Sequence, residues 1–588
     1  MSNMSNMSNM TATQRNEARR AAAGIERLSD IQIPLSDGTN LLADVYRPAD
    51  NATHPVIIRL GVYGRAFDVG AITDEDSRLA SEEREDAWFR RSSPKVAPPD
   101  FYENMVSANV SDWVPRGYVC VRVDARGVGR VPGVIDPFSV QEARDYYEVI
   151  EWAAKQSWSN GSVGLYGGSY NAGTAWNVAA LAPPSLRAII PFAGDIDIYR
   201  EVTHPGGLAM VGFLETWLEG NVKAVQGGQC ETVDMLDRIK QHPFADPEHY
   251  GPDGDTICVP DLSKVTVPFL TSVCLGAPVH GRGGAEAFLA AVNAPAKELL
   301  VVDANYWPFM YEDCLQQQFD FFDRHLKDIP TTSYPPVRFI MRSGRGEYEW
   351  KEDTQWPLSH TKYLDFYLDA SQKALSLNTP IKPGVSIYSA EAPTNQTASP
   401  HAIFESPPLT DDINLAGPIS TILWVSSSST DMDIYAVLRV LDPEGKEISY
   451  AVRPLMQGCP LSHGCLKVSH RATDPQRSTP WRPFHTHREK DYAPLKPGEI
   501  CSVHVEMTLA TARVRRGSRF QLLIEPFSGE SSSTWKAYGG IASPGNQAGD
   551  NGESVGGRAY DIAYHKGAEN RIHTGGVHLS RLLIPSVR

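Results

Sequence analysis

A serine on a tight turn between a strand and a helix is the residue of this sequence best suited to chemistry. Residues 163–173 read VGLYGGSYNAG, so an apolar strand runs through two glycines into Ser169 and then into a helical segment. Such a turn exposes the serine hydroxyl at the carboxyl edge of a sheet, beside helix amides that can stabilise an oxyanion. The usual G-x-S-x-G pattern would place glycine at position 171, where this chain has Asn171. We predict that Ser169 is a catalytic nucleophile.

The segments around this turn predict alternating strands and helices. Residues 31–48 predict a β-hairpin that turns at Asp37-Gly38, and the runs HPVIIRL and GYVCVRVD predict strands buried on both faces. A helix is expected from Ser139 to position 156, with Ser139 and Glu142 forming a capping box. After the serine turn come a helix over 172–182 and a strand over 188–194. This alternation indicates a doubly wound α/β core.

Two changes of pattern divide the rest of the chain. From about 200 to 260 the segments are helical, which predicts a cap inserted over the sheet, and the α/β pattern then resumes. From 335 onward short alternating strands and Pro or Gly turns predict an all-β sandwich or jelly roll, with a long loop at 528–557. We therefore expect a disordered tail at 1–28, an α/β domain at 29–334 and a β domain at 335–588.

Several motifs, in order along nearly the whole chain, resemble those of one family. The turn reads GGSYNA, and it is accompanied by RLGVYG, VDARGVG, FFDRHLK, TDMDIYAVL, SHRATDPQRSTPW and NRIHTGG. In these motifs the chain resembles the cocaine esterases, α-amino-acid ester hydrolases and X-prolyl dipeptidyl-peptidases, whose turn reads G-x-S-Y-x-G. Here Ala172 stands in the last place. The resemblance implies an α/β-hydrolase fold with a helical cap and a C-terminal jelly roll, and hydrolysis of ester or amide bonds through a Ser169 acyl-enzyme.

The resemblance also implies an oxyanion hole. In that family a tyrosine hydroxyl after the third strand acts together with the amide that follows the nucleophile. By position these groups are the phenol of Tyr63 and the backbone N–H of Tyr170.

The acid and base of the family do not match this sequence. The family places an Asp after the next-to-last strand of the sheet and a His after the last, and neither loop of this chain has that residue. An exchanged arrangement is available, with His280 as the base and Asp303 as the acid that orients it. Glu286 and Glu312 are further candidates for the acid. The alternative is that His280 and Asp303 never meet Ser169.

Composition limits the partners. The net charge of −15 argues against a general binder of nucleic acid or anionic membranes. The scattered cysteines indicate a reducing compartment, so we expect a cytoplasmic protein, and the resemblance implies a small ester or amide substrate. No cofactor is expected. His485 and His487 have a spacing that could serve a metal, but without a carboxylate pattern they predict an ordinary polar loop and no metal site.

Two other classes of function stay open. The chain could be a degenerate member of the fold that binds a ligand or guides a non-hydrolytic step such as cyclisation, using an oxyanion hole without a base. It could also be a ligand-binding β-sandwich attached to an inert α/β body. Labelling of Ser169 by an active-site probe separates these classes from a serine hydrolase.

Overall fold

The computed structural model describes most of the chain. The described residues are 20–65, 106–227, 230–277, 279–303, 314–344, 346–390, 401–450, 460–526 and 567–587. The predicted loop at 528–557, most of the predicted tail and Glu312 therefore lie outside the described residues.

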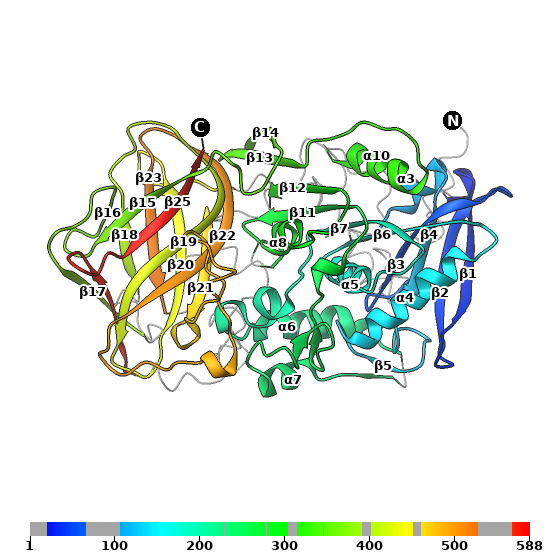
Figure 1. Cartoon of the computed structure of the whole chain (residues 1–588), viewed down its shortest axis with the longest axis horizontal. Helices are drawn as coiled ribbons and strands as arrows, with labels where there is room; N and C mark the ends of the chain where they lie inside the picture. Colours follow the sequence, from blue (N-terminus) through cyan, green and yellow to red (C-terminus); the bar gives the residue numbers. More distant parts are fainter. Residues whose placement is uncertain are drawn as a thin grey trace, which may run out of the picture.

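A mixed, mostly parallel sheet forms the core of the first half of the chain (Figure 1). Its strands run in the spatial order β1, β2, β4, β3, β6, β7, β11, β12 and β13. Their bounds are β1 Ile25–Pro34, β2 Asn40–Pro48, β4 Val119–Asp124, β3 His54–Gly61, β6 Ser159–Gly168, β7 Leu186–Phe192, β11 Phe269–Leu275, β12 Lys297–Asp303 and β13 Val337–Gly344. Only β1 and β2 pair antiparallel to their neighbours in this series. The predicted hairpin and doubly wound sheet are confirmed.

Helices cover both faces of this sheet. Successive side chains along a strand point to opposite faces of the sheet and belong to two separate apolar clusters. In β3, for example, Ile58 belongs to one cluster and Ile57 to the other. One cluster contains residues of α4 (Val140–Ala154), α5 (Tyr170–Ala179) and α8 (Gly283–Ala290). The other contains residues of α3 (Val110–Trp113) and α10 (Leu315–Leu326), which lie together in Figure 1. Two-sided burial explains why the strands read as continuous apolar runs.

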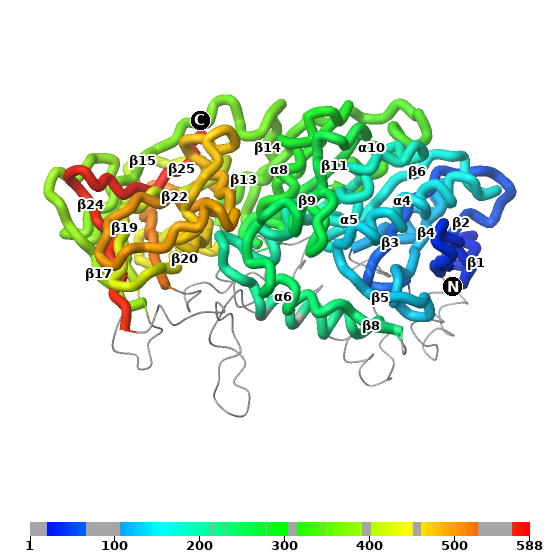
Figure 2. Tube along the Cα trace, turned by 60° about the horizontal axis from the view of Figure 1, so that its bottom comes forward, coloured from blue at the N-terminus to red at the C-terminus, as the bar shows by residue number. Residues whose placement is uncertain are grey.

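The cap of this structure is the insertion between β7 and β11. It consists of short helical turns and very short strands. The elements are η3 Tyr199–Thr203, η4 Pro205–Gly207, α6 Val211–Trp217, η5 Leu218–Val222, η6 Lys223–Val225, β8 Glu231–Thr232, α7 Met235–Gln241, β9 Tyr250–Gly251, β10 Ile257–Cys258 and η7 Leu262–Lys264. Figure 2 shows α6 running along one side of the molecule, below the sheet.

A β-sandwich forms the second half of the chain and carries its own core (Figure 1). One layer is built on β19 (Ile413–Ser427), which pairs antiparallel with β22, β24 and β25. The other is built on β20 (Asp433–Leu441), which pairs antiparallel with β21 and β23. The remaining bounds are β14 Glu347–Asp353, β15 Lys362–Asp369, β16 Ala374–Ser376, β17 Gly384–Ser389, β18 Ala402–Glu405, β21 Ser462–Lys467, β22 Cys501–Val514, β23 Arg519–Glu525, β24 Glu569–Thr574 and β25 Arg581–Val587. Apolar residues of both layers share one cluster, as a sandwich requires.

The two halves are joined at one edge. β13 pairs in parallel with β22 at Arg342 and Ala512, so the α/β sheet continues into the sandwich. Within the described residues, no helix has the length and apolar character that a membrane crossing requires.

Candidate active site

Ser169 lies on a strained turn between β6 and α5. Its backbone angles are φ +57° and ψ −129°, a conformation that L-residues rarely adopt. The turn is held from both sides, because the N–H of Ser169 donates to the carbonyl of Ala193 at 3.0 Å and the carbonyl of Ser169 accepts from the N–H of Ala172 at 2.9 Å. The side chain is partly exposed. These features are those of a nucleophile turn, and they are the placement predicted for Ser169.

Two glycines beside this turn are needed because other residues approach their backbones closely. A Cβ atom on Gly168 would lie 2.6 Å from the ring of Phe192, and one on Gly194 would lie 2.2 Å from the Cβ of Ala172. Neither distance is sterically possible without movement. Gly194 therefore makes the room that Ala172 needs, which explains how this chain accommodates alanine where the resembled turn has glycine.

His280 reaches the nucleophile from the loop after β11. Its Nε2 lies 3.2 Å from the Oγ of Ser169, within the range expected for a base in a protein without bound substrate. The residue is buried, and its φ of +69° is unusual for histidine. The carbonyl of His280 accepts from the N–H of Cys274 at 3.1 Å, which closes the loop back onto β11. The structure thus brings together Ser169 and His280, as the exchanged arrangement requires.

The carboxylate beside His280 is Asp195, not Asp303. Asp195 Oδ2 lies 2.8 Å from Nδ1 of His280, and Asp195 Oδ1 accepts from the backbone N–H of His280 at 2.9 Å. Asp303 ends β12 and is buried there. Because Asp195 binds the backbone as well as the ring, the loop folds toward β7 and the nucleophile turn. The pairing of His280 with Asp303 that we predicted is therefore replaced by a pairing with Asp195.

Asp195 and His280 each lie one strand earlier than the acid and the base that the resemblance implies. Asp195 follows β7 and His280 follows β11, whereas the family pattern uses β11 and β12. The sequence did carry a signal for Asp195, since it is the first acidic residue after a predicted strand ending at the same sheet edge as Ser169. Of the other acid candidates, Glu286 forms ion pairs with Arg282 and Arg482.

Tyr63, the residue predicted to help form an oxyanion hole, lies beside Ser169. Burial raises the pKa of its phenol, and hydrogen bonds with Trp217 and Ser169 act in the opposite direction. Trp217 Nε1 donates to the phenol oxygen at 2.9 Å, so the phenol's own proton can be directed elsewhere. Trp217 belongs to the cap, and nothing in the sequence signalled this contact.

Tyr170 is fixed by a buried carboxyl group. It is the first residue of α5, and the first N–H groups of a helix have no carbonyl partner within the helix. Its phenol donates to Glu142, and its ring packs edge-on against Tyr63 with centroids 5.5 Å apart. Burial raises the pKa of Glu142 to about 8, although hydrogen bonds from Tyr170 and the N–H of Phe138 oppose the shift. This packing holds the first turn of α5 against Tyr63.

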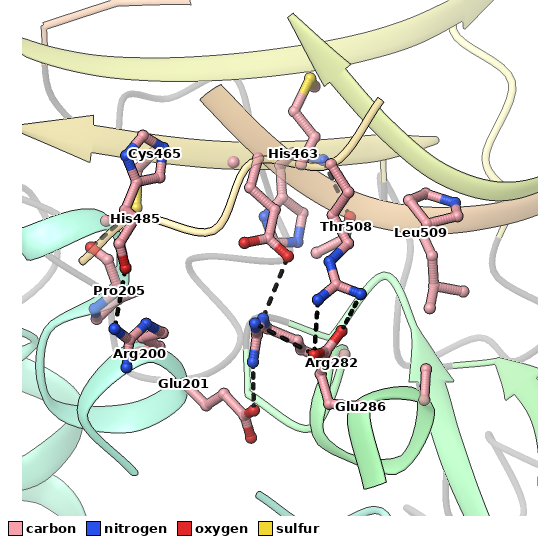
Figure 3. Close-up of a pocket in the computed structure, with 18 of the residues that line it drawn as sticks. Arg200, Glu201, Pro205, Arg282, Glu286, His463, Cys465, His485, Thr508 and Leu509 are labelled. Carbon is pink, nitrogen blue, oxygen red and sulfur yellow. Dashed lines mark hydrogen bonds and ion pairs between the residues drawn. The ribbon is translucent and has the colours of Figure 1, made fainter. Parts of the chain in front are cut away.

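A cavity of about 120 Å³ opens beside His280, between α8 and the sandwich strands β21 and β22 (Figure 3). Arg282 lines it and forms ion pairs at 3.1 Å with Glu201 of the cap and with Glu506 of the sandwich. Its walls also include the apolar side chains of Leu289 and Leu509. His280 therefore borders a cavity that is lined by residues of the sheet loops, the cap and the sandwich.

The histidines that the sequence suggested for a metal lie in the interface between the cap and the sandwich. His485 Nε2 is 2.8 Å from the carbonyl of His504, and His487 Nδ1 is 3.3 Å from Nδ1 of His470. Both side chains are buried, unlike those of an open polar loop.

Two protein families match the two halves of the chain separately. Residues 37–257 match the X-Pro dipeptidyl-peptidase (S15 family), and residues 331–583 match the X-Pro dipeptidyl-peptidase C-terminal non-catalytic domain. The cocaine esterase of a Rhodococcus strain is 24% identical over 95% of this chain and 98% of its own. A Xaa-Pro dipeptidyl-peptidase assigned in Streptomyces avermitilis is 22% identical over 73% of this chain and 69% of its own.

Solved structures agree in fold over nearly the whole length. A CocE/NonD family hydrolase from Staphylococcus aureus superposes with a TM-score of 0.79 and 28% identity, covering 96% of this chain and 94% of that one. An α-amino acid ester hydrolase superposes with a TM-score of 0.68 at 17% identity, over 96% and 97% of the two chains. At that identity the second likeness is one of fold alone.

Proposed function

Because the chain belongs to the cocaine esterase and X-Pro dipeptidyl-peptidase family and is a serine hydrolase, we propose that it cleaves small ester or amide substrates through an acyl-enzyme on Ser169. The names of its relatives denote cleavage of an ester in one case and of a peptide bond in the other. Both bonds join an acyl carbon to a leaving group, and one mechanism serves both.

In the proposed first step, Ser169 Oγ attacks the acyl carbon and its proton passes to Nε2 of His280. Asp195 keeps the ring in the tautomer with its proton on Nδ1 and stabilises the imidazolium that forms. Negative charge develops on the former carbonyl oxygen, where the phenol of Tyr63 and the N–H of Tyr170 would donate hydrogen bonds. The bond between the acyl carbon and the leaving group then breaks, the proton on Nε2 passes to the leaving group, and the acyl group stays on Oγ.

In the second step water is the nucleophile. His280 removes a proton from water as its oxygen attacks the acyl carbon. The bond between the acyl carbon and Ser169 Oγ then breaks, the carboxylic acid is released, and the proton on His280 passes to Oγ. No group beyond the four side chains and one backbone amide is needed. The protein supplies position and a fixed electrostatic environment, which cost little reorganisation during the reaction.

The contact between Ser169 Oγ and His280 Nε2, at 3.2 Å, is the observation that carries this proposal. The degenerate-fold alternative depended on a serine without a base. A base in hydrogen-bond reach, with a carboxylate behind it, supports the hydrolase instead.

An active-site probe tests the proposal directly. We expect a fluorophosphonate to label the wild-type protein and not Ser169→Ala, because the phosphorus atom bonds to an activated serine oxygen. His280→Ala should label roughly 10³-fold more slowly, since the proton acceptor is lost. The rate of probe incorporation on a gel is the measurement.

Ser162→Ala is the matched control, because Ser162 lies in the same strand as the turn but outside the site. It should label at the wild-type rate. A wild-type protein that fails to label, or labelling that survives Ser169→Ala, would contradict the proposed nucleophile and favour a binding or cyclisation role.

A further inference from the structure

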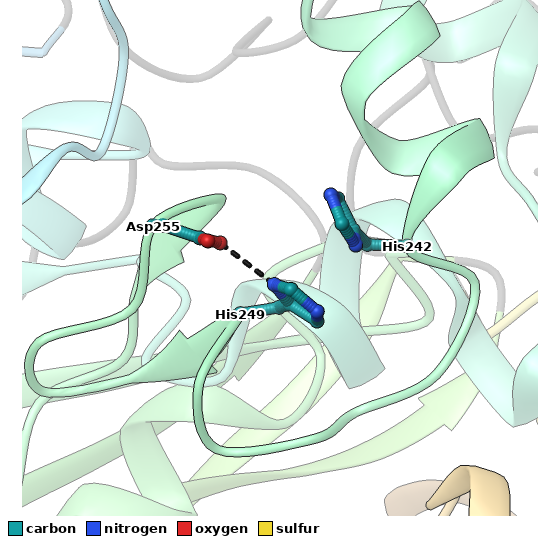
Figure 4. Close-up of side chains that lie close together, drawn as sticks. All are labelled: His242, His249 and Asp255. Atoms are coloured by element: carbon teal, nitrogen blue, oxygen red, sulfur yellow. Dashed lines mark hydrogen bonds and ion pairs between the residues drawn. The ribbon is translucent and has the colours of Figure 1, made fainter.

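Two histidines and an aspartate gather in the cap, away from the catalytic residues (Figure 4). His242 directly follows α7, His249 lies in the turn before β9, and Asp255 lies in the turn between β9 and β10. One possible ligand atom from each residue lies within 4.8 Å of the other two. Nδ1 of His249 is 2.7 Å from Oδ1 of Asp255, and the two imidazole rings have centroids 3.7 Å apart.

We propose that His242, His249 and Asp255 bind a divalent transition-metal ion of the Zn²⁺ type. Metal bonds to imidazole nitrogen and carboxylate oxygen are about 2.0–2.2 Å long, so two donors on one ion are separated by no more than roughly 4.4 Å. The three donors lie within 4.8 Å of one another, which is close to that limit. Two imidazoles and one carboxylate suit Zn²⁺, whereas Ca²⁺ and Mg²⁺ prefer oxygen ligands throughout.

The backbone that carries these side chains is already fixed. The Tyr250 phenol donates to the carbonyl of His242 at 2.7 Å. The carbonyl of His249 accepts from the N–H of Ile257 at 3.0 Å, and the N–H of Asp255 donates to Glu248 at 3.0 Å. A set of ligands held in place before binding loses little conformational entropy when the ion arrives.

The site also has access to solvent. The side chain of Asp255 is 67% exposed and that of His249 is 26% exposed. An ion can therefore enter directly, and water can complete a tetrahedral set as the fourth ligand.

The position of the site gives the ion a structural role in the cap. It would join the end of α7 to the β9–β10 turn. The ring of Tyr250, next to His249, packs edge-on against Tyr199 with centroids 4.9 Å apart. Tyr199 begins η3, which also contains Glu201, one of the residues bordering the cavity beside His280. Metal binding would thus stiffen the part of the cap that backs the active site.

Zinc titration of the full-length protein, stripped beforehand with a chelator, tests the site. By isothermal titration calorimetry we expect one equivalent of Zn²⁺ to bind to the wild type, and the affinity to fall more than about 10-fold in His242→Ala, His249→Ala and Asp255→Asn. Co²⁺ in place of Zn²⁺ should give visible absorption that reports the coordination geometry, and the same variants should lose it.

His54→Ala is the matched control. The imidazole of His54 pairs with the single carboxylate of Asp50 at 3.0 Å, which is a histidine–aspartate pair outside the proposed site. The His54→Ala variant should bind Zn²⁺ with the same affinity and stoichiometry as the wild type. Asp255→Asn keeps the shape of an exposed side chain, so its circular dichroism spectrum should match that of the wild type even if a histidine variant misfolds.

The outcomes are distinct. Loss of the single zinc equivalent in the three variants and its retention in His54→Ala supports the site. A wild-type protein that binds no zinc, or variants of these three residues that bind with unchanged affinity and stoichiometry, overturns it.

Discussion

Asp195 performs two tasks with its two carboxylate oxygens. One oxygen accepts from the backbone N–H of His280, which fixes where the loop lies, and the other lies 2.8 Å from Nδ1 of the ring. In the proposed mechanism, Asp195 would set both the position and the protonation state of His280. Asp195 follows β7 rather than β11, so the proposed acid comes from a different loop than the resemblance implies.

Asp195→Asn should lower kcat roughly 10³–10⁴-fold on a chromogenic ester. The amide NH₂ can donate to Nδ1 but cannot accept from it, so the imidazole is held with its proton on Nε2, where it cannot act as a base. The asparagine keeps the size of the side chain, and the effect should therefore appear in kcat more than in the melting temperature.

Asp303→Asn is the comparison that discriminates the two carboxylates. It removes the charge of a buried aspartate at the end of β12, and kcat per folded molecule should change less than about 10-fold. A collapse of kcat in Asp303→Asn with activity retained in Asp195→Asn would return the acid role to Asp303.

At the scale of elements, the nucleophile turn depends on close contact between α5 and the loop after β7. The backbone of Gly194 lies close to the side chain of Ala172. The loop that contains Gly194 also supplies the Ala193 carbonyl, which accepts a hydrogen bond from the N–H of Ser169. The strained angles of Ser169 persist because these neighbours leave the backbone no alternative.

Gly194→Ala should destabilise the fold by about 1–3 kcal/mol and reduce kcat, because the new Cβ would lie 2.2 Å from that of Ala172. Adding Ala172→Gly removes the opposing methyl group, so the double variant should regain most of the activity. Urea denaturation and ester hydrolysis measure the two effects.

Gly220→Ala serves as the control, since a Cβ there meets nothing within 4 Å. It should have little effect on either measurement. If Ala172→Gly fails to rescue Gly194→Ala, the contact between the two residues is not what limits the turn.

Sequence patterns predicted these elements well because burial and periodicity act locally. The turn with two glycines before Ser169 and the strands rich in β-branched residues can each be recognised from a few consecutive residues. The contacts of Asp195 and Trp217 were missed for a different reason. Which carboxylate meets His280 depends on how a loop folds across a neighbouring strand, and Trp217 reaches Tyr63 from a cap whose helices have no regular pattern.

At the scale of the whole molecule, charged residues join the hydrolase half to the sandwich. Arg282 follows His280 by two positions and pairs with Glu506 of β22, while Arg482 pairs with Glu286 of α8 at 2.9 Å. Burial raises the pKa of Glu506, but the two arginines outweigh it and the net shift is downward. The stability that Glu506 contributes is therefore present above its usual pKa of 4.5 and is lost only as the pH falls through its lower folded value.

Buried histidines in the interface between the cap and the sandwich give the molecule a second, separate dependence on pH. Burial lowers the pKa of His204 to about 3 and that of His470 to about 3, and it lowers that of His487 well below its usual value. Such a histidine is neutral in the folded protein, whereas the unfolded chain takes up a proton near pH 6.5. Acid therefore favours unfolding in this window, above the range in which Glu506 titrates.

We expect the free energy of unfolding to fall as the pH decreases from about 6.5 toward 5, by up to about 1.4 kcal/mol per pH unit for each such histidine. Urea denaturation curves across this range measure the slope. His470→Gln removes one titrating group and should make the slope shallower, while His360→Gln, at an exposed position, should leave it unchanged. A stability that stays flat between these pH values, or a slope that His470→Gln does not alter, would show that the neutral histidines of this interface do not link folding to protons.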